Sequence, residues 1–134
     1  MNNNPYTAVC FGEILWDILP DARLPGGAPM NVAYHLNQLQ VPTAMISRIG
    51  NDPLGEELLQ FISSKGVDTS FIQNDEIYDT GTVLATLNGN NASYEIIQPV
   101  AWDFIQYSMQ VQKLVSLAQY FIFGSLLARN EKSA

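Results

Sequence analysis

The sequence predicts an α/β protein in which short buried strands alternate with helices and a β-hairpin is added as an antiparallel extension. Apolar runs at residues 6–11, 43–49 and 120–123 are each followed directly by a glycine, as is typical of parallel strands buried on both faces. Segments with helical spacing of apolar residues separate these runs, which favours a layered sheet with flanking helices. At 134 residues, 47% hydrophobic and 14% charged, the composition is that of one soluble globular domain.

The first forty residues predict two strands and a helix. Residues 6–11 form the first strand and residues 14–19 the second. The Leu-Pro-Gly-Gly-Ala-Pro cluster at 24–29 interrupts regular structure, and a helix follows it. The apolar residues of that helix lie at helical spacing and are Val32, Leu36 and Leu39.

A third strand and a second helix follow. Residues 43–49 form the strand, after which Asp52 is placed to cap a helix whose first turn holds Pro53. Lys65 and Gly66 supply the stop. The apolar face of this helix comprises Leu54, Leu58, Phe61 and Ile62.

The remaining segments predict a hairpin, a helix and a last strand. Residues 81–88 and 92–98 flank Gly-Asn-Asn, a pattern expected of a β-hairpin. A helix covers much of 104–117, and residues 120–123 form another buried strand. So apolar a strand belongs in the middle of a parallel sheet, yet only ten residues follow Gly124. We therefore expect a fold truncated after its first half.

Charge and composition exclude several classes of partner. Six basic against 13 acidic residues give a net charge of −7, which repels nucleic acid and anionic membrane surfaces. Cys10 is the single cysteine and lies in an apolar run, so no intrachain disulfide is expected. With His35 as the only histidine, the ligand set of a zinc site is missing. No signal peptide or apolar run of membrane-spanning length is present, so a cytoplasmic protein is expected, with no membrane partner.

Several segments match one enzyme family in order and spacing. They are Phe11–Asp17 (FGEILWD), Gly26–Ala33 (GGAPMNVA), Ser47–Gly55 (SRIGNDPLG), Thr80–Thr82 (TGT), Gln98–Asp103 (QPVAWD) and Phe123–Arg129 (FGSLLAR). Together they resemble the PfkB carbohydrate kinases, most like the fructokinase branch. The resemblance implies a ribokinase-like fold, and it covers nearly the whole chain.

The resemblance implies a sugar-binding role for Asp17, Gly26, Gly27 and Asn31. The chemistry of these residue types agrees, since an ionised carboxylate accepts hydrogen bonds from two sugar hydroxyls at once. Glycines let the backbone approach a ligand closely, and an asparagine offers a donor and an acceptor. Taken without their context, the same residues would be a loop aspartate, a turn and an asparagine near a helix start.

Family members cover the sugar with a small β-sheet used as a lid, and the resemblance assigns lid strands to about 14–19 and 81–98. Tyr94 in the hairpin could stack on a sugar ring, or pack on neighbouring strands. Arg129 is a further candidate to reach the substrate, or a solvated arginine. Two copies of the chain could pair through the lid strands as a homodimer.

The catalytic half of such an enzyme is not in this sequence. Family members use ATP and Mg²⁺, with the catalytic base in a Gly-Ala-Gly-Asp motif of the C-terminal half, and that motif is missing here. A phosphate-binding loop and a dinucleotide fingerprint are also absent. We therefore expect no catalytic residues, no metal site and no ATP binding in this chain alone.

Three functional hypotheses remain. The first is the N-terminal, sugar-binding portion of a fructokinase-like enzyme that phosphorylates a sugar hydroxyl when complete. The second is a non-catalytic sugar-binding or assembly module. The third is a nucleoside kinase of the same superfamily, against which the Ala-Trp-Asp and Gly-Ser-Leu segments argue mildly.

Overall fold

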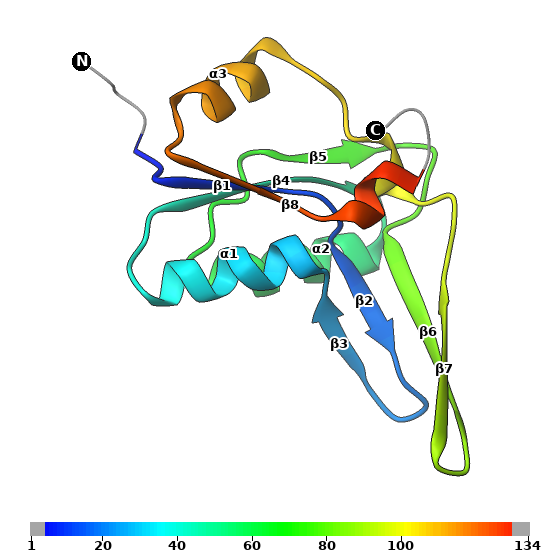
Figure 1. The fold of residues 1–134 in the computed structure, drawn as a ribbon. Coiled ribbons are helices and arrows are strands. Elements are labelled where there is room, and N and C mark those ends of the chain that lie inside the picture. Colours follow the sequence, from blue (N-terminus) through cyan, green and yellow to red (C-terminus); the bar gives the residue numbers. More distant parts are fainter. Residues whose placement is uncertain (1–4, 130–134) are drawn as a thin grey trace.

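The computed structural model describes residues 5–129, whose strands form two four-stranded sheets (Figure 1). The first sheet has the order β5-β4-β1-β8, and all of its pairings are parallel. The second has the order β3-β2-β6-β7, with β2 parallel to β6 and both outer strands antiparallel to their neighbours. The strands are β1 (Ala8–Phe11), β2 (Leu15–Ile18), β3 (Arg23–Gly26), β4 (Thr43–Gly50), β5 (Ile72–Asp75), β6 (Gly81–Asn88), β7 (Asn91–Ile96) and β8 (Tyr120–Phe123).

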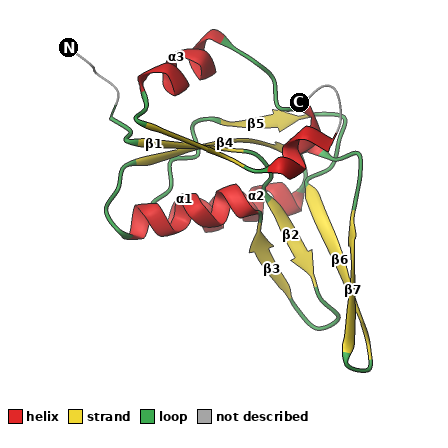
Figure 2. Ribbon diagram, viewed as in Figure 1, coloured by secondary structure: helices red, strands yellow, loops and turns green. Residues whose placement is uncertain are grey.

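Helices cover both faces of the first sheet, as Figure 2 shows. They are α1 (Ala28–Gln38), α2 (Pro53–Ser64) and α3 (Met109–Leu117). Cys10 and Met45 pack into the core beneath α1 and α2, whereas Val9 and Ile46 pack into a second core with Leu114 of α3. The α/β class and the burial of β1 and β4 on both faces are therefore confirmed.

The helix α2 begins and ends as predicted. The carboxylate of Asp52 accepts a hydrogen bond from the backbone N–H of Gly55 at 2.8 Å, which caps the first turn. Lys65 is the C-cap, and Gly66 follows it with φ of +83°, a conformation that favours glycine.

The predicted packing face of α1 is wrong in part. The residues of this helix that lie in the core are Met30 and Ala33, with Leu36 packed beside them. Val32 is 37% exposed, and Leu39, beyond the last turn, is 74% exposed. The small side chain of Ala33 lets the helix approach the sheet along a face that the larger residues do not occupy.

The helix predicted over 104–117 is divided. Residues Ala101–Phe104 form a 3₁₀ turn, and α3 starts only at Met109. Between them the Gln106 N–H donates to the side chain of Gln73 at 2.8 Å, so this stretch is bonded to β5 instead of continuing a helix. Ser108 then caps α3 by accepting from the N–H of Val111.

The last strand forms where predicted, but the expectation that it is buried is wrong. β8 pairs with β1 alone and is the edge of the first sheet in residues 5–129. Tyr120, Phe121 and Phe123 are 62%, 44% and 66% exposed. The Phe121 ring packs on Phe11 and Phe123 at 5.9 and 5.5 Å between ring centroids, leaving the outer side of these rings uncovered.

Two strands were not predicted because their sequences look like loops. β3 contains Pro25 and part of the 24–29 cluster, and a proline is accommodated there because β3 is an edge strand. β5 is also at an edge and has the polar sequence Ile-Gln-Asn-Asp, which conceals a strand. The hairpin β6–β7 forms as predicted, with Gly89 in its turn at φ of +65°.

Candidate functional site

The predicted site residues lie where the chain passes from the first sheet to the second. After β1 ends at Phe11, residues 12–14 lead directly into β2, and β3 returns to the start of α1 (Figure 1). In open parallel α/β sheets, ligands bind outside the carboxyl ends of the strands. The end of β1 and the first turn of α1 meet at such an edge, with the second sheet beside it.

Asp17 and Gly26 lie on paired strands of the second sheet. β2 and β3 are antiparallel, with Leu15 opposite Gly26 and Asp17 opposite Leu24. A Cβ atom built on Gly26 would lie 2.5 Å from Oδ2 of Asp17, so the carboxylate occupies the space that a side chain there would fill. Burial raises the pKa of Asp17 above its ordinary value.

Gly27 joins β3 to α1 in a conformation that requires glycine. Its φ is +111°, and a Cβ there would collide with the backbone carbonyl of Glu13. The Gly27 carbonyl accepts the N–H of Asn31 at 2.9 Å, which closes the first turn of the helix. The side chain of Asn31 is exposed on this turn.

The structure therefore brings together four of the six predicted site residues. Gly26 is in contact with the carboxylate of Asp17, and Gly27 and Asn31 follow it through the start of α1. Together they offer a carboxylate from Asp17 and an amide from Asn31. A carboxylate accepts hydrogen bonds from hydroxyl groups, and an amide both donates and accepts.

Glu13 is a candidate site residue that the sequence-based prediction missed. It follows β1, is only 4% exposed, and its Oε1 lies 3.4 Å from the N–H of Ala28 at the positive end of α1. Its Oε2 has no hydrogen-bond partner among residues 5–129, and a Cβ on Gly124 would lie 3.8 Å from that atom. The available signal was a glutamate within an otherwise apolar run, because buried carboxylates are rare.

Tyr94 is not brought to these four residues. It lies on β7, the outer strand of the second sheet, opposite Ala85, and is 69% exposed. β6 separates β7 from the strand that carries Asp17. A contact between Tyr94 and a sugar stays a prediction.

Arg129 already has partners within the chain. Its Nη2 and Nε lie 2.5 and 2.6 Å from the two carboxylate oxygens of Asp103, and Nη2 also donates to the carbonyl of Ile97 at 3.0 Å. Only 13% of its side chain is exposed, so the alternative of a solvated arginine is wrong. Its contact with a substrate stays a prediction.

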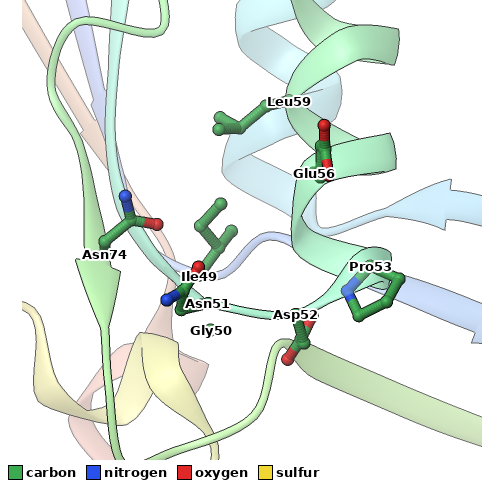
Figure 3. A pocket seen from close by; sticks show the side chains of 8 residues that line it. All are labelled: Ile49, Gly50, Asn51, Asp52, Pro53, Glu56, Leu59 and Asn74. Atoms are coloured by element: carbon green, nitrogen blue, oxygen red, sulfur yellow. The ribbon is translucent and has the colours of Figure 1, made fainter.

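A hollow of about 400 Å³ lies apart from the predicted residues, between the ends of β4 and β5 and the start of α2 (Figure 3). It is lined by Ile49, Gly50, Asn51, Asp52, Pro53, Glu56, Leu59 and Asn74. The Asp52 carboxylate in its wall is fully engaged, since it accepts from Gly55 and from the N–H and hydroxyl of Thr80. We assign that aspartate to capping α2 and anchoring the start of β6.

Neither a metal centre nor a membrane span is found among residues 5–129. No group of three or more histidine, cysteine, aspartate or glutamate residues in this range could hold a metal ion. No helix of the same range has the length and apolar character needed to cross a bilayer.

Comparisons with known proteins give one consistent result. The family model described as "pfkB family carbohydrate kinase" matches residues 22–133. A sugar kinase from Pyrococcus horikoshii is 39% identical over an alignment of 131 positions that covers 89% of this chain and 42% of that protein. A fructokinase from Escherichia coli is 36% identical over an alignment of 102 positions that covers 71% of this chain and 33% of that protein.

Solved structures agree with the sequence comparisons. The Pyrococcus horikoshii sugar kinase in complex with ATP superimposes with a TM-score of 0.79 and 35% identity, over 93% of this chain and 45% of that one. A Vibrio cholerae fructokinase with fructose, ADP and calcium bound gives a TM-score of 0.65 and 29% identity, over 78% of this chain and 36% of that one. The chain therefore spans less than half the length of these relatives.

Proposed function

Because this chain belongs to the pfkB family of carbohydrate kinases, we propose that it is the sugar-binding portion of a fructokinase-like enzyme. In its complete form, the enzyme transfers the γ-phosphoryl group of ATP to a sugar hydroxyl. The observation that carries the proposal is the Asp17 carboxylate held against Gly26 beside the first turn of α1.

The proposed site residues act by orienting the sugar. The two oxygens of Asp17 accept hydrogen bonds from neighbouring hydroxyls, and the Asn31 amide both donates and accepts at the adjoining helical turn. Gly26 leaves room for the Asp17 carboxylate, and Gly27 leaves room for the backbone carbonyl of Glu13. Fructose is the first candidate, because a fructokinase relative binds it in a solved structure.

The nucleotide belongs to the part of the enzyme outside this chain. Phosphoryl transfer requires residues that position the phosphates, a divalent metal and a base. Among residues 5–129, no group of three or more histidine, cysteine, aspartate or glutamate residues could hold a metal ion. ATP and Mg²⁺, bound elsewhere, would supply the phosphoryl donor and neutralise its charge. The residues of this chain would bind and orient the sugar.

The same proposal includes a location in the cell and a pairing of two copies of the chain. A sugar kinase of this kind works in the cytoplasm, where ATP is available. We also propose that two copies of the chain pair through the lid strands, which are β2, β3, β6 and β7. The exposed apolar side chains of the hairpin support it, among them Leu84, Leu87, Tyr94 and Ile96.

Isothermal titration of the purified chain with fructose, other hexoses, ribose and nucleosides tests the proposal. We expect heat from one sugar class, lost in Asp17→Asn, and no heat from ATP with Mg²⁺. Preferential binding of a nucleoside would favour the nucleoside kinase alternative. Fructose phosphorylation by the 134-residue chain would contradict the assignment of catalysis to a missing part.

A further inference from the structure

The hairpin β6–β7 is held to the rest of the molecule mainly at its base. Every residue of β7 is exposed, as are Leu84 and the last three residues of β6. β6 pairs with β2 from Gly81 to Leu84, and beyond Leu84 it pairs with β7 alone. The orientation of the hairpin therefore depends on the pairing of β6 with β2 and on the contacts made by residues 81–82 and 97.

Trp102 fills the space at the start of β6. The side chain is fully buried, and a Cβ built on Gly81 would lie 2.5 Å from its ring. The guanidinium of Arg129 covers the ring, with its central carbon 3.9 Å from the ring centroid, a cation–π arrangement. Trp102 is therefore packed between the first residue of β6 and the turn that follows β8.

The exit of β7 is held by the same group. The Ile97 N–H donates to the carbonyl of Thr82 at 3.2 Å, and the Ile97 carbonyl accepts from Nη2 of Arg129 at 3.0 Å. Asp103, which is 1% exposed, pairs with Arg129 through both oxygens and also accepts the N–H of Val100 at 2.9 Å. Entry and exit of the hairpin thus converge on one buried ion pair.

We propose that Arg129 and Asp103 are positioning residues that fix the hairpin β6–β7 through Trp102. Arg129 lies in the turn after β8 of the first sheet, so the pair links the hairpin of one sheet to the edge strand of the other. The proposal rests on the proposed function only in making this hairpin the cover of a sugar site. That Arg129 and Asp103 fix the hairpin rests on the contacts described above and not on the proposed function.

The chemistry of the Arg129–Asp103 pair explains why it can hold the hairpin in one orientation. A carboxylate as buried as Asp103 is costly unless it is paired, and removing the guanidinium leaves its charge uncompensated. Arginine presents two parallel donors to both oxygens, a geometry that lysine cannot reproduce. The pair therefore restrains orientation as well as distance.

Hydrogen–deuterium exchange on the full chain without sugar tests whether the ion pair fixes the hairpin. In Arg129→Ala we expect amides 81–84 and 96–98 to exchange about 10- to 100-fold faster, the range expected for loss of hydrogen bonds to charged groups. Amides of β1 and β4 should keep their rates. Arg48→Ala is the matched control, since Arg48 pairs with Asp75 with 14% of its side chain exposed. It should leave residues 81–84 and 96–98 unchanged.

Conservative variants keep the test decisive if Arg129→Ala unfolds. Arg129→Lys retains the charge, loses the paired donors, and should give an intermediate acceleration at the same amides. Asp103→Asn should accelerate them with the arginine still present. Unchanged rates at the hairpin base in both variants would overturn the proposal.

A sugar titration of the same variants separates this inference from the proposed function. Weaker sugar binding in both Asp103→Asn and Arg129→Lys, together with faster hairpin exchange, supports positioning. Weaker binding with unchanged exchange would instead make Arg129 a direct sugar contact and overturn positioning. If the unaltered chain binds no sugar, the proposed function fails, and the exchange data still decide whether the pair fixes the hairpin.

Discussion

The carboxylate of Asp17 lies against Gly26, and a Cβ on that glycine would come 2.5 Å from Oδ2. This contact links two adjacent strands, β2 and β3, at the last residue of β3, two positions before α1 begins. The contact requires a carboxylate at position 17 and the absence of a side chain at position 26, so each residue can be tested by its own substitution.

Gly26→Ala should displace the Asp17 carboxylate and reduce sugar affinity at least about tenfold, with an overpacking cost of about 1–3 kcal/mol in the free energy of unfolding. Titration calorimetry and urea denaturation measure the two effects. Gly89→Ala in the hairpin turn is a control for sugar affinity alone, because nothing lies within 4 Å of a Cβ there but its φ of +65° strains an alanine. A Gly26→Ala chain that binds sugar as well as the unaltered chain would show that the carboxylate is not used as proposed.

Asp17→Asn should abolish sugar binding while leaving the fold as stable or more stable at neutral pH. Burial raises the pKa of Asp17 in the folded chain. The contribution of this group to stability is therefore fully present below its unfolded pKa and is lost as pH rises through the folded value. Thermal unfolding from pH 3 to 8 should show the variant gaining on the unaltered chain as pH increases. A variant that is less stable at pH 7 would contradict this.

Glu13→Gln should fold with a loss below about 1–2 kcal/mol, because one oxygen still accepts from the Ala28 N–H and only the charge at the helix start is removed. Glu13→Ala removes that acceptor from the Ala28 N–H and should cost about 1.5–3 kcal/mol for the lost hydrogen bond to a charged group, plus a cavity term for the buried side chain. Urea denaturation of both variants checks the order. Equal losses would mean that the hydrogen bond to α1 contributes nothing.

Acid should weaken the fold partly through Asp75. Burial alone would raise the pKa of this carboxyl, but bonds from Arg48 and from the backbone N–H groups of Tyr78 and Ile77 outweigh it, so its pKa lies below the usual 3.8. Its contribution is present above that unfolded value and is lost as pH falls through the folded value. Asp75→Asn should therefore flatten the acid side of the stability curve below about pH 5. An unchanged acid slope would contradict the ion pair with Arg48.

Local patterns predicted much of the fold, because buried parallel strands and capped helices have strong signatures. Asp52 before Pro53 located the start of α2, and the run containing Val9 and Cys10 identified a central strand. The edge strands were harder. β3 carries a proline and β5 carries polar residues, since neither is enclosed by neighbours on both sides.

The site was predicted less completely, since contacts between distant residues have no local signature. The motif resemblance indicated Asp17, Gly26, Gly27 and Asn31, and the structure brings these four together. It did not indicate Glu13, whose burial depends on the docking of α1. Tertiary contacts also determine Arg129, because Asp103, its partner, lies 26 positions earlier in the chain.

The most direct test of the central claim is an NMR titration of the ¹⁵N-labelled chain with fructose. The account predicts saturable chemical-shift changes at the amides of Asp17, Gly26, Gly27 and Asn31, which disappear in Asp17→Asn. Changes confined to the hollow around Asn51 and Asn74, or none at any fructose concentration with the fold intact, would contradict a sugar site at the junction of the two sheets.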